Sequence, residues 1–451
     1  MQKSSLYIAF NRFGYGATPA LAKLNIQDPK KWLLDQLRDY SIQNPKWTSE
    51  QALKQIFAYR HDRKMIQQSA ENNKAITSLK AKRREMINSS KKLSAQIILQ
   101  ATQTEQPLQA RLQDFFANHF SLSNTNANMR TIAPTLESEA IAPHLNGYFA
   151  DMLVSVTRHP AMLYYLNNES SIGPNSALGL KRQKRGLNEN LGREILELHT
   201  LGVNGGYTQS DVQALSKSLT GWSIGGRKKR EALGFVFKAY AHEPGEKILL
   251  GKRYAAATRN SDQQAVDMLN SLATHDQTAQ HLSYKIAKHF IADSPPQTLV
   301  QQMAKRWVDT RGHIPSVMTI MIGHPLSWLP KSSKFKTPRE YVISLQRACQ
   351  LRNTKPDILK TLEILGQAPY SSGSPAGFSD NAQDWASASA LMDRIEWAEH
   401  IAGQVKMSPI EAAMVALGDL LSPSTAQHIM RAESKQQGLA ILFMSPEFLR
   451  R

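Results

Sequence analysis

The stretch from Gly186 to Trp222, GLNENLGREILELHTLGVNGGYTQSDVQALSKSLTGW, decides the fold because it encodes two helices joined by a glycine-rich turn. Asn188 is typical of a helix N-cap, and Gly202 follows the last periodic residue as a helix-ending glycine does. This pattern predicts a first helix of about thirteen residues. Thr208 and Asp211 have the spacing of a capping box, which predicts the start of a second helix.

The first predicted helix carries a polar face. At 100° per residue, Asn190, Glu194 and Glu197 gather on one side of the helix. Arg193 lies four residues before Glu197 and four after Glu189, so it can bridge both carboxylates. One interpretation is an ion-pair ladder that only fixes helix packing. The other is a paired-carboxylate site at Glu194 and Glu197, with Arg193 and Asn190 as substrate-binding residues.

His199 and Asp211 are further candidates for this site, because the turn between the helices brings them near the polar face. His199 lies two residues past Glu197, which is about 200° around the helix axis. One regular helix therefore cannot direct both side chains at one metal ion. A metal could use both only if the last turn opens or if other segments supply ligands.

Two other places hold groups that could take part in chemistry. His242 and Glu243 form a second concentration of polar residues, with Lys247 nearby. His119 ends the helix predicted after Pro107, where a cation complements the helix dipole, and it is also a candidate metal ligand or general base. Glu243 is the second candidate ligand, so a divalent metal is a candidate cofactor.

Several motifs outside the central stretch extend the pattern over nearly the whole chain. They include FNRFGYGATP near the start, NHF at 118–120, RHPAMLYYL at 158–166, KFKTPREY at 334–341 and GQAPYSSGSPAGF at 366–378. With LELHTLGV, GGYTQSDV and LTGW in the central stretch, the sequence resembles the bacterial family catalogued as domain of unknown function 1800. The resemblance implies that the chain is a member of this family. It implies no reaction, because the family name is not linked to any known activity.

Composition limits the class of protein. The 451 residues are 41% hydrophobic, which is enough for a packed core and excludes the disordered class. The formal net charge is +18, which indicates a basic protein with an acidic partner surface or a polyanion as a candidate partner. Cys349 is the only cysteine, so no intramolecular disulfide framework exists.

The charge is concentrated between Lys54 and Lys92, where eleven Lys and Arg face three Asp and Glu. Such a segment could bind phosphate backbones or anionic lipid. The simpler interpretation is a long helical hairpin whose charges face water. Tyr59 is almost the only aromatic residue available to stack bases, and no common nucleic-acid module is visible, so nucleic acid is an unlikely partner.

The rest of the chain predicts an all-α fold, a single large multi-helix domain over residues 1–451. Phe235-Val236-Phe237 and Ile248-Leu249-Leu250 are the best strand candidates and predict one small β-hairpin near 234–253. No apolar run approaches the roughly 20 residues of a transmembrane helix. The first residues lack the apolar core of a signal peptide, which favours a cytoplasmic protein. Export through a start codon upstream of Met1 is the alternative, because many family members look exported.

Two functional hypotheses follow. The first is an enzyme, a metal-assisted or acid–base hydrolase, in which the catalytic groups converge with His119 and Arg193 orients an anionic substrate. Its catalytic candidates are Glu194, Glu197, His199, Asp211 and His242, with Arg193, Asn190 and Lys247 as substrate-binding candidates. The second is a non-catalytic helical binding or assembly protein that uses its basic surface on an acidic partner. In that case the central stretch only holds the helices together.

Overall fold

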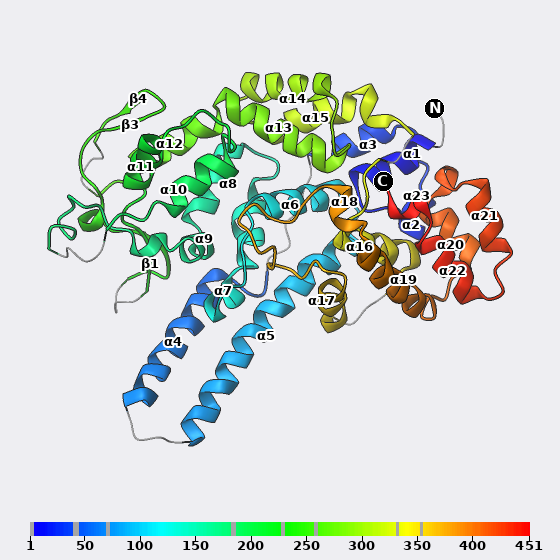
Figure 1. The fold of residues 1–451 in the computed structure, drawn as a ribbon, viewed down its shortest axis with the longest axis horizontal. Helices are drawn as coiled ribbons and strands as arrows, with labels where there is room; N and C mark the ends of the chain where they lie inside the picture. The colour runs from blue at the N-terminus through cyan, green and yellow to red at the C-terminus, as the bar shows by residue number, and fades with distance from the viewer. Residues whose placement is uncertain are drawn as a thin grey trace.

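The computed structural model describes residues 4–38, 45–68, 73–181, 186–226, 231–256, 260–330, 333–351 and 355–451. The fold is helical, and the described residues contain only two small antiparallel sheets of two strands each (Figure 1). This confirms the predicted all-α class. None of the described helices is both long and apolar enough to cross a membrane.

The chain begins with short helices that pack against the middle of the molecule. These are α1 (Ser4–Ile8), the π-helical turn η1 (Ala9–Phe13), α2 (Pro19–Ala22) and α3 (Pro29–Gln36). Thr18 and Asp28 cap α2 and α3, and a proline follows each cap at the first helical position. Proline suits this position because its missing N–H would have no partner inside the helix.

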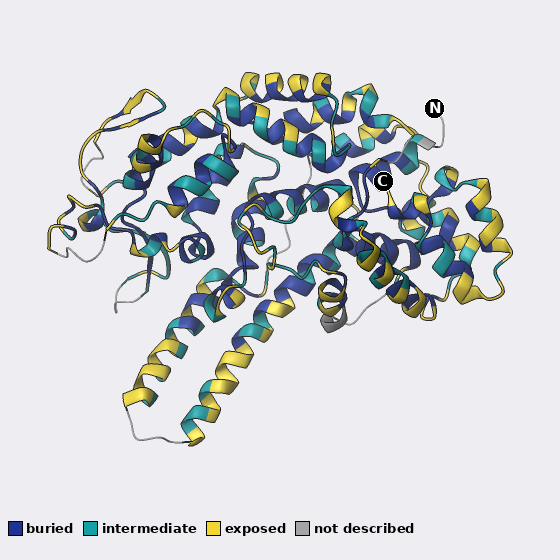
Figure 2. Ribbon diagram, in the orientation of Figure 1, coloured by how far each residue is buried: buried dark blue, intermediate teal, exposed yellow. Residues whose placement is uncertain are grey.

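Two long antiparallel helices, α4 (Ser49–Gln68) and α5 (Asn73–Gln103), extend away from the body of the molecule (Figure 1). We call this pair the arm. Apolar residues near its base, such as Leu53, Ile56 and Leu93, are buried. The distal part of both helices is largely exposed (Figure 2). The helical hairpin predicted for the basic segment is therefore present.

Shorter helices follow the arm and supply many buried apolar residues. They are α6 (Pro107–His119), α7 (Ala127–Ile132), η2 (Glu137–Ile141), η3 (Ala142–His144), α8 (Phe149–Arg158), α9 (Pro160–Tyr165) and η4 (Asn168–Ser170). In α6, Leu108, Leu112, Phe115 and Phe116 are buried, as their helical spacing predicts.

The central stretch forms α10 (Asn190–Glu194), the π-helical turn η5 (Ile195–His199) and α11 (Gln209–Ser218). The capping box of Thr208 and Asp211 is present at the start of α11. The first helix is shorter than predicted, and its last turn is widened into a π-helix. The two helices approach closely at Gly192, where an added Cβ would overlap Ser216.

The strands pair with their nearest neighbours along the chain. β1 (Trp222–Gly225) pairs with β2 (Gly234–Phe237), and β3 (Lys247–Leu249) pairs with β4 (Lys252–Tyr254), while η6 (Ala239–Ala241) lies between the two sheets. The expectation that Phe235–Phe237 would pair with the strand after the His242 turn is wrong. Leu250 and Gly251 both have positive φ, which is the geometry of a tight two-residue hairpin turn. This turn folds β3 back onto β4 instead.

The remaining helices complete the body. They are α12 (Gln263–Ala273), α13 (Asp276–Phe290), α14 (Gln297–Asp309), α15 (Ile314–Gly323), η7 (Pro325–Trp328), α16 (Pro338–Cys349), α17 (Lys355–Ile364), α18 (Ala382–Trp385), α19 (Ala388–Ala402), α20 (Pro409–Ala416), η8 (Gly418–Leu420), α21 (Pro423–Met430), α22 (Lys435–Phe443) and α23 (Pro446–Leu449).

The described apolar residues form two large clusters and one small one. The first cluster runs from Ala9 to Ile322 and the second is built mainly from α16 to α23. Helix α5 contributes to both, with Leu93 in the first cluster and Ile98 in the second. Whether the whole chain is one domain stays a prediction.

Candidate functional site

Glu194 and Glu197 lie close enough to influence each other. Burial of Glu194, and secondly the negative charge of Glu197, raise the pKa of the Glu194 carboxyl group. Arg193 donates to Glu189 at 3.1 Å and to Gln209 at 2.9 Å, so it forms one half of the expected ladder. Asn190 is exposed. The paired carboxylates therefore exist, but the other predicted catalytic groups lie elsewhere.

His199 and His119 form a separate buried pair, with ring centroids 6.0 Å apart. His119 Nε2 donates to the carbonyl oxygen of His199 at 3.2 Å, and Lys285 Nζ donates to His119 Nδ1 at 3.0 Å. Burial, and secondly the Lys285 charge, lower the pKa of His119 well below its usual range and that of His199 to about 3. Both nitrogens of a neutral His119 are thus engaged, which leaves neither for a metal.

Asp211 is committed to structure. Its carboxylate accepts from the amide and hydroxyl of Thr208 at 2.8 and 2.6 Å and from the amide of Leu250 at 2.7 Å. These bonds cap α11 and fix the turn between β3 and β4. The aspartate is turned to its own helix N-terminus, and its convergence with Glu197 and His199 stays a prediction.

His242, Glu243 and Lys247 also hold loops together. Glu243 accepts from the amide and side chain of Asn175 at 2.8 and 2.7 Å, and Lys247 donates to the Glu243 carbonyl oxygen at 2.9 Å. His242 Nδ1 lies 3.0 Å from the carbonyl oxygen of Thr220. In the described ranges, no group of three His, Cys, Asp or Glu side chains is placed to bind a metal ion. The predicted ligands His119 and Glu243 therefore do not belong to a three-ligand set there.

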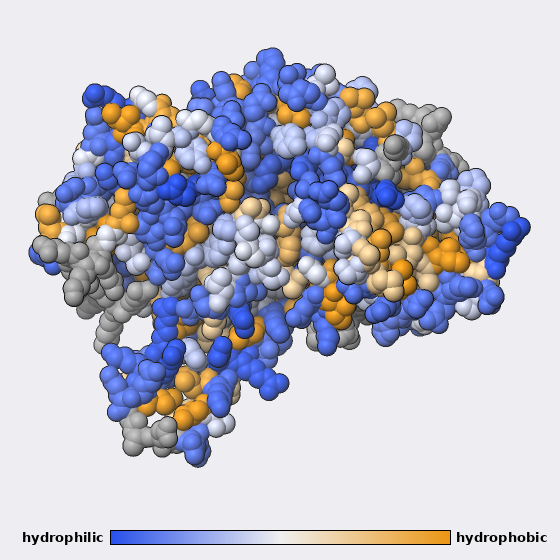
Figure 3. Space-filling model, in the orientation of Figure 1, coloured by the Kyte–Doolittle hydropathy of each residue, from blue (hydrophilic) through white to orange (hydrophobic). Residues whose placement is uncertain are grey.

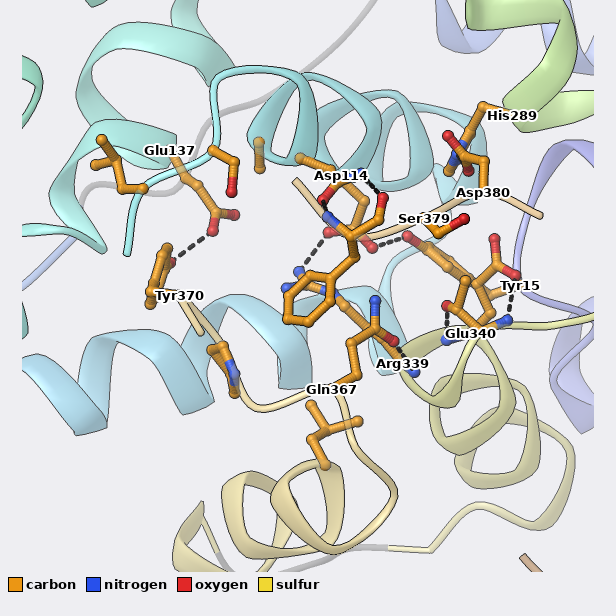
Figure 4. A pocket seen from close by; sticks show the side chains of 18 residues that line it. Tyr15, Asp114, Glu137, His289, Arg339, Glu340, Gln367, Tyr370, Ser379 and Asp380 are labelled. Atoms are coloured by element: carbon orange, nitrogen blue, oxygen red, sulfur yellow. Dashed lines mark hydrogen bonds and ion pairs between the residues drawn. The ribbon is translucent and has the colours of Figure 1, made fainter. Parts of the chain in front are cut away.

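A cavity of about 80 Å³ lies at the junction of α6, η2, α13, α16 and the loop 366–380 (Figure 4). It has room for two or three water molecules at about 30 Å³ each. Its wall is rich in ionisable and polar side chains from six parts of the chain, namely Tyr15, Asp114, Glu137, His289, Arg339, Glu340, Tyr370 and Asp380.

Two carboxylates of this wall are each bonded to a tyrosine. Tyr15 donates to Asp114, which also forms an ion pair with Arg339, and Tyr370 donates to Glu137 at 2.5 Å (Figure 4). Burial is the largest effect on Asp114 and raises the pKa of its carboxyl group, although the Arg339 charge opposes this shift. Both carboxylates are therefore held in place by a tyrosine hydroxyl group.

His289 and Asp380 form a base and its orienting partner. His289 Nδ1 lies 2.9 Å from Asp380 Oδ1, so this nitrogen donates and the carboxylate accepts. Burial lowers the pKa of His289, and His289 lowers the pKa of Asp380 to about 2 although burial opposes it. His289 Nε2 is buried and has no hydrogen-bond partner among the described residues. A neutral imidazole with one nitrogen bonded to a carboxylate and the other free is the usual arrangement of a general base.

The loop 366–380 closes the cavity and is tied to α6. Asn118 donates to the carbonyl oxygen of Phe378 at 2.9 Å and accepts from its amide at 2.7 Å. The amide of Asn124 donates to Tyr370 O at 2.8 Å. Gly377 has a φ of 87°, and a Cβ there would overlap the Asn118 carbonyl oxygen. The glycine is therefore required for the close approach of loop and helix.

Helix α13 connects the cavity to the buried histidine pair. His281, Lys285 and His289 are spaced four residues apart and share one face of this helix. Burial lowers the pKa of Lys285 to about 8, and Asp380 is the anion that opposes this shift. The same carboxylate therefore acts on the base at the cavity and on the amine that contacts His119.

The cavity was missed at the sequence level although three motifs supply its wall. NHF contains Asn118, KFKTPREY contains Arg339 and Glu340, and GQAPYSSGSPAGF contains Tyr370. These motifs carried the family resemblance, but nothing in their spacing indicates that they meet. His281 and His289 were recognisable as residues that share a helix face.

Comparison with known proteins gives one match. A family model described as "Protein of unknown function (DUF1800)" matches residues 8–450. Neither a curated protein nor a solved structure matches the chain.

Proposed function

We propose that this chain, which belongs to the family of proteins of unknown function named above, is an enzyme. The proposed enzyme is a hydrolase that uses acid–base catalysis. The reaction takes place at the cavity beside His289. The observation that supports this proposal is the His289–Asp380 pair, in which the second ring nitrogen is buried and has no partner among the described residues. The acid–base form is preferred to the metal-assisted form because those residues offer no set of three metal ligands.

The pair assigns a role to each group. His289 Nε2 accepts a proton from a water molecule as the water oxygen forms a bond to the electrophilic atom of the substrate. Asp380 stabilises the imidazolium ion through the 2.9 Å hydrogen bond to Nδ1. The proton then passes from His289 to the leaving group, which restores the neutral ring. Asp114 forms an ion pair with Arg339 in the same wall, and Arg339 is the cation beside the reacting group.

The size of the cavity restricts the substrate. About 80 Å³ accommodates a small group and not a whole metabolite. The reacting group of a larger substrate enters when the loop 366–380 moves away from Asn118 and Asn124. When the loop moves, the four hydrogen bonds between these two asparagines and the loop are broken, and the same four atoms form hydrogen bonds with water.

The proposal is tested by screening the purified protein for hydrolysis of chromogenic esters, phosphoesters and glycosides. The variants His289→Gln and Asp380→Asn are then compared with a control variant at the surface, His400→Gln. Loss of the base or its partner is expected to lower kcat/KM by about 10²- to 10⁴-fold, with folding checked by urea unfolding. Protonation of the base at low pH causes the acidic limb of the pH profile, so this limb should disappear in His289→Gln. Unchanged turnover in His289→Gln would refute the assignment. Turnover that is lost instead in Glu194→Gln would move the site to the central stretch.

A second candidate function is favoured by the charge distribution. The arm carries eleven Lys and Arg against three Asp and Glu between residues 54 and 92, a difference of eight within the net +18 of the chain. We propose binding of an acidic partner at this surface as the alternative to catalysis. If substitution of arm cations by neutral residues makes the protein elute from an anionic resin at lower salt than the wild type, the result would support this alternative. Retention that does not depend on salt would count against it.

A further inference from the structure

The arm presents cations that the protein itself does not neutralise. In the described part of the arm, eight cations are exposed and have no ion pair, hydrogen bond or ring contact, namely Lys54, Arg63, Lys64, Lys80, Arg83, Arg84, Lys91 and Lys92. Lys82 is paired with Asp62, and Arg60 contacts Tyr164. From Lys80 to Lys92 helix α5 rises by about 18 Å, so the free cations of this helix follow it over that length.

This charge pattern works against the stability of the arm. Arg60 and Lys64 are four residues apart on α4, and Lys80 and Arg84 are four apart on α5. Like charges at this spacing repel on a helix surface, whereas alternating Glu and Lys would stabilise it. A hairpin that only faced water would gain from such pairs. A partner that supplies negative charge would relieve this repulsion.

The chemistry of the arm surface narrows the kind of partner. Met65 is the only exposed large apolar residue in the described part of the arm, and Figure 3 shows an arm surface that is mainly hydrophilic, with a smaller hydrophobic patch between the two helices. The arm therefore lacks the broad apolar face with which amphipathic helices enter a bilayer, and it lacks aromatic anchors for a protein partner. The Phe57 and Tyr59 rings are partly buried against the core, so neither stands free on the arm to stack single-stranded bases.

We propose that the arm binds double-stranded nucleic acid through its phosphate backbone, without reading the base sequence. Backbone binding needs only cations that follow a regular array of phosphates, and it releases the counterions held there. Lys80, Arg84 and Lys91 lie within about 40° of each other around α5 and form one continuous row. This inference deepens the second candidate function, because it names the class of the acidic partner.

The test measures the affinity of the full chain for a labelled DNA duplex of about 20 base pairs at about 50 to 200 mM salt. The triple variant Lys80→Gln, Arg84→Gln, Lys91→Gln removes the row. A control variant with the same loss of charge, Lys360→Gln, Lys406→Gln, Arg431→Gln, removes exposed cations outside the arm. The row variant should bind at least about 10-fold more weakly, with a slope of log affinity against log salt that is shallower by about 2.7.

Three results would overturn the inference. An equal loss in the control variant would mean that the general charge of the protein is responsible. Absence of duplex binding at low salt would also refute it. If vesicles containing phosphatidylserine, or polyglutamate, bind in an arm-dependent way while the duplex does not, nucleic acid is the wrong partner, although the second candidate function then stands. A positive duplex result with competition by excess mixed-sequence DNA supports the inference in full.

Discussion

At the level of single residues, His199 of the LELHTLGV motif is packed in the core, and burial there changes the pKa of its imidazole ring. It is 2% exposed and lies beside the ring of Phe120, with centroids 5.0 Å apart. Burial, and secondly the charge of Lys285, lower its pKa to about 3. The folded protein therefore holds this ring neutral at any pH at which the protein is expected to work.

The free energy of unfolding should consequently fall as the pH falls below about 6.5. The unfolded chain binds a proton on His199 near pH 6.5, whereas the folded chain does so only near pH 3. Because the unfolded state binds more protons between these values, the group contributes a loss of about 2.7 kcal/mol at pH 4.5 relative to pH 7. Urea unfolding of the wild type and of His199→Asn at both pH values measures it. An equal pH dependence in the two proteins would contradict the shift.

At the level of elements, the central stretch depends on a close contact between two short helices, at which Gly192 has no side chain of its own. Helix α10 meets α11 at Gly192, where a Cβ would overlap Ser216 Oγ and lie 3.0 Å from the Ser216 amide nitrogen. This close approach positions the paired carboxylates Glu194 and Glu197 on the adjoining turn. A backbone neighbour cannot move aside as a flexible side chain can, so the position has little tolerance for added volume.

Gly192→Ala should destabilise the protein by about 1 to 3 kcal/mol, although alanine favours a helix intrinsically. Gly186→Ala is the matched control, because no atom lies within 4 Å of a Cβ there. Thermal and urea unfolding compare the two variants with the wild type. A stabilised Gly192→Ala protein would show that α10 and α11 separate at no cost.

At the level of the whole molecule, the cavity lies where the two large apolar clusters meet. Glu340 of α16 forms an ion pair with Arg111 of α6. It forms a second ion pair with Arg451, in which Glu340 Oε1 lies 2.7 Å from Arg451 Nη2. Arg451 also donates to the carbonyl oxygens of His289 and Phe290 at 2.7 and 3.2 Å. One buried carboxylate thus joins three helices and the final residue of the sequence around the candidate site.

Glu340→Gln should lower the free energy of unfolding by about 3 to 5 kcal/mol, because it leaves two buried guanidinium groups without their anion. Glu363→Gln on the exposed face of α17 is the matched control and should change stability by less than about 0.5 kcal/mol. Urea unfolding followed by tryptophan fluorescence gives both values. A loss below about 1 kcal/mol for Glu340→Gln would show that water replaces the carboxylate in the folded state.

Local signals in the sequence determined much of this protein. The helical class, the capping box at Thr208, the buried face of α6 and the helical nature of the basic segment follow from spacing over a few residues. These features depend on the backbone and on neighbours three or four positions away. The pairing of the strands was wrong because the turn at Leu250 and Gly251 adopts positive φ, which a leucine does not indicate.

Only the tertiary structure decided which polar residues meet. Asp211 and Glu243 carry the residue types of a catalytic or metal site, yet their oxygens accept from backbone amides of nearby loops. Asp114, His289 and Asp380 are separated by up to 266 positions and converge on one cavity. The physical reason is that a site is built from long-range contacts, which packing of whole helices creates and which no local periodicity records.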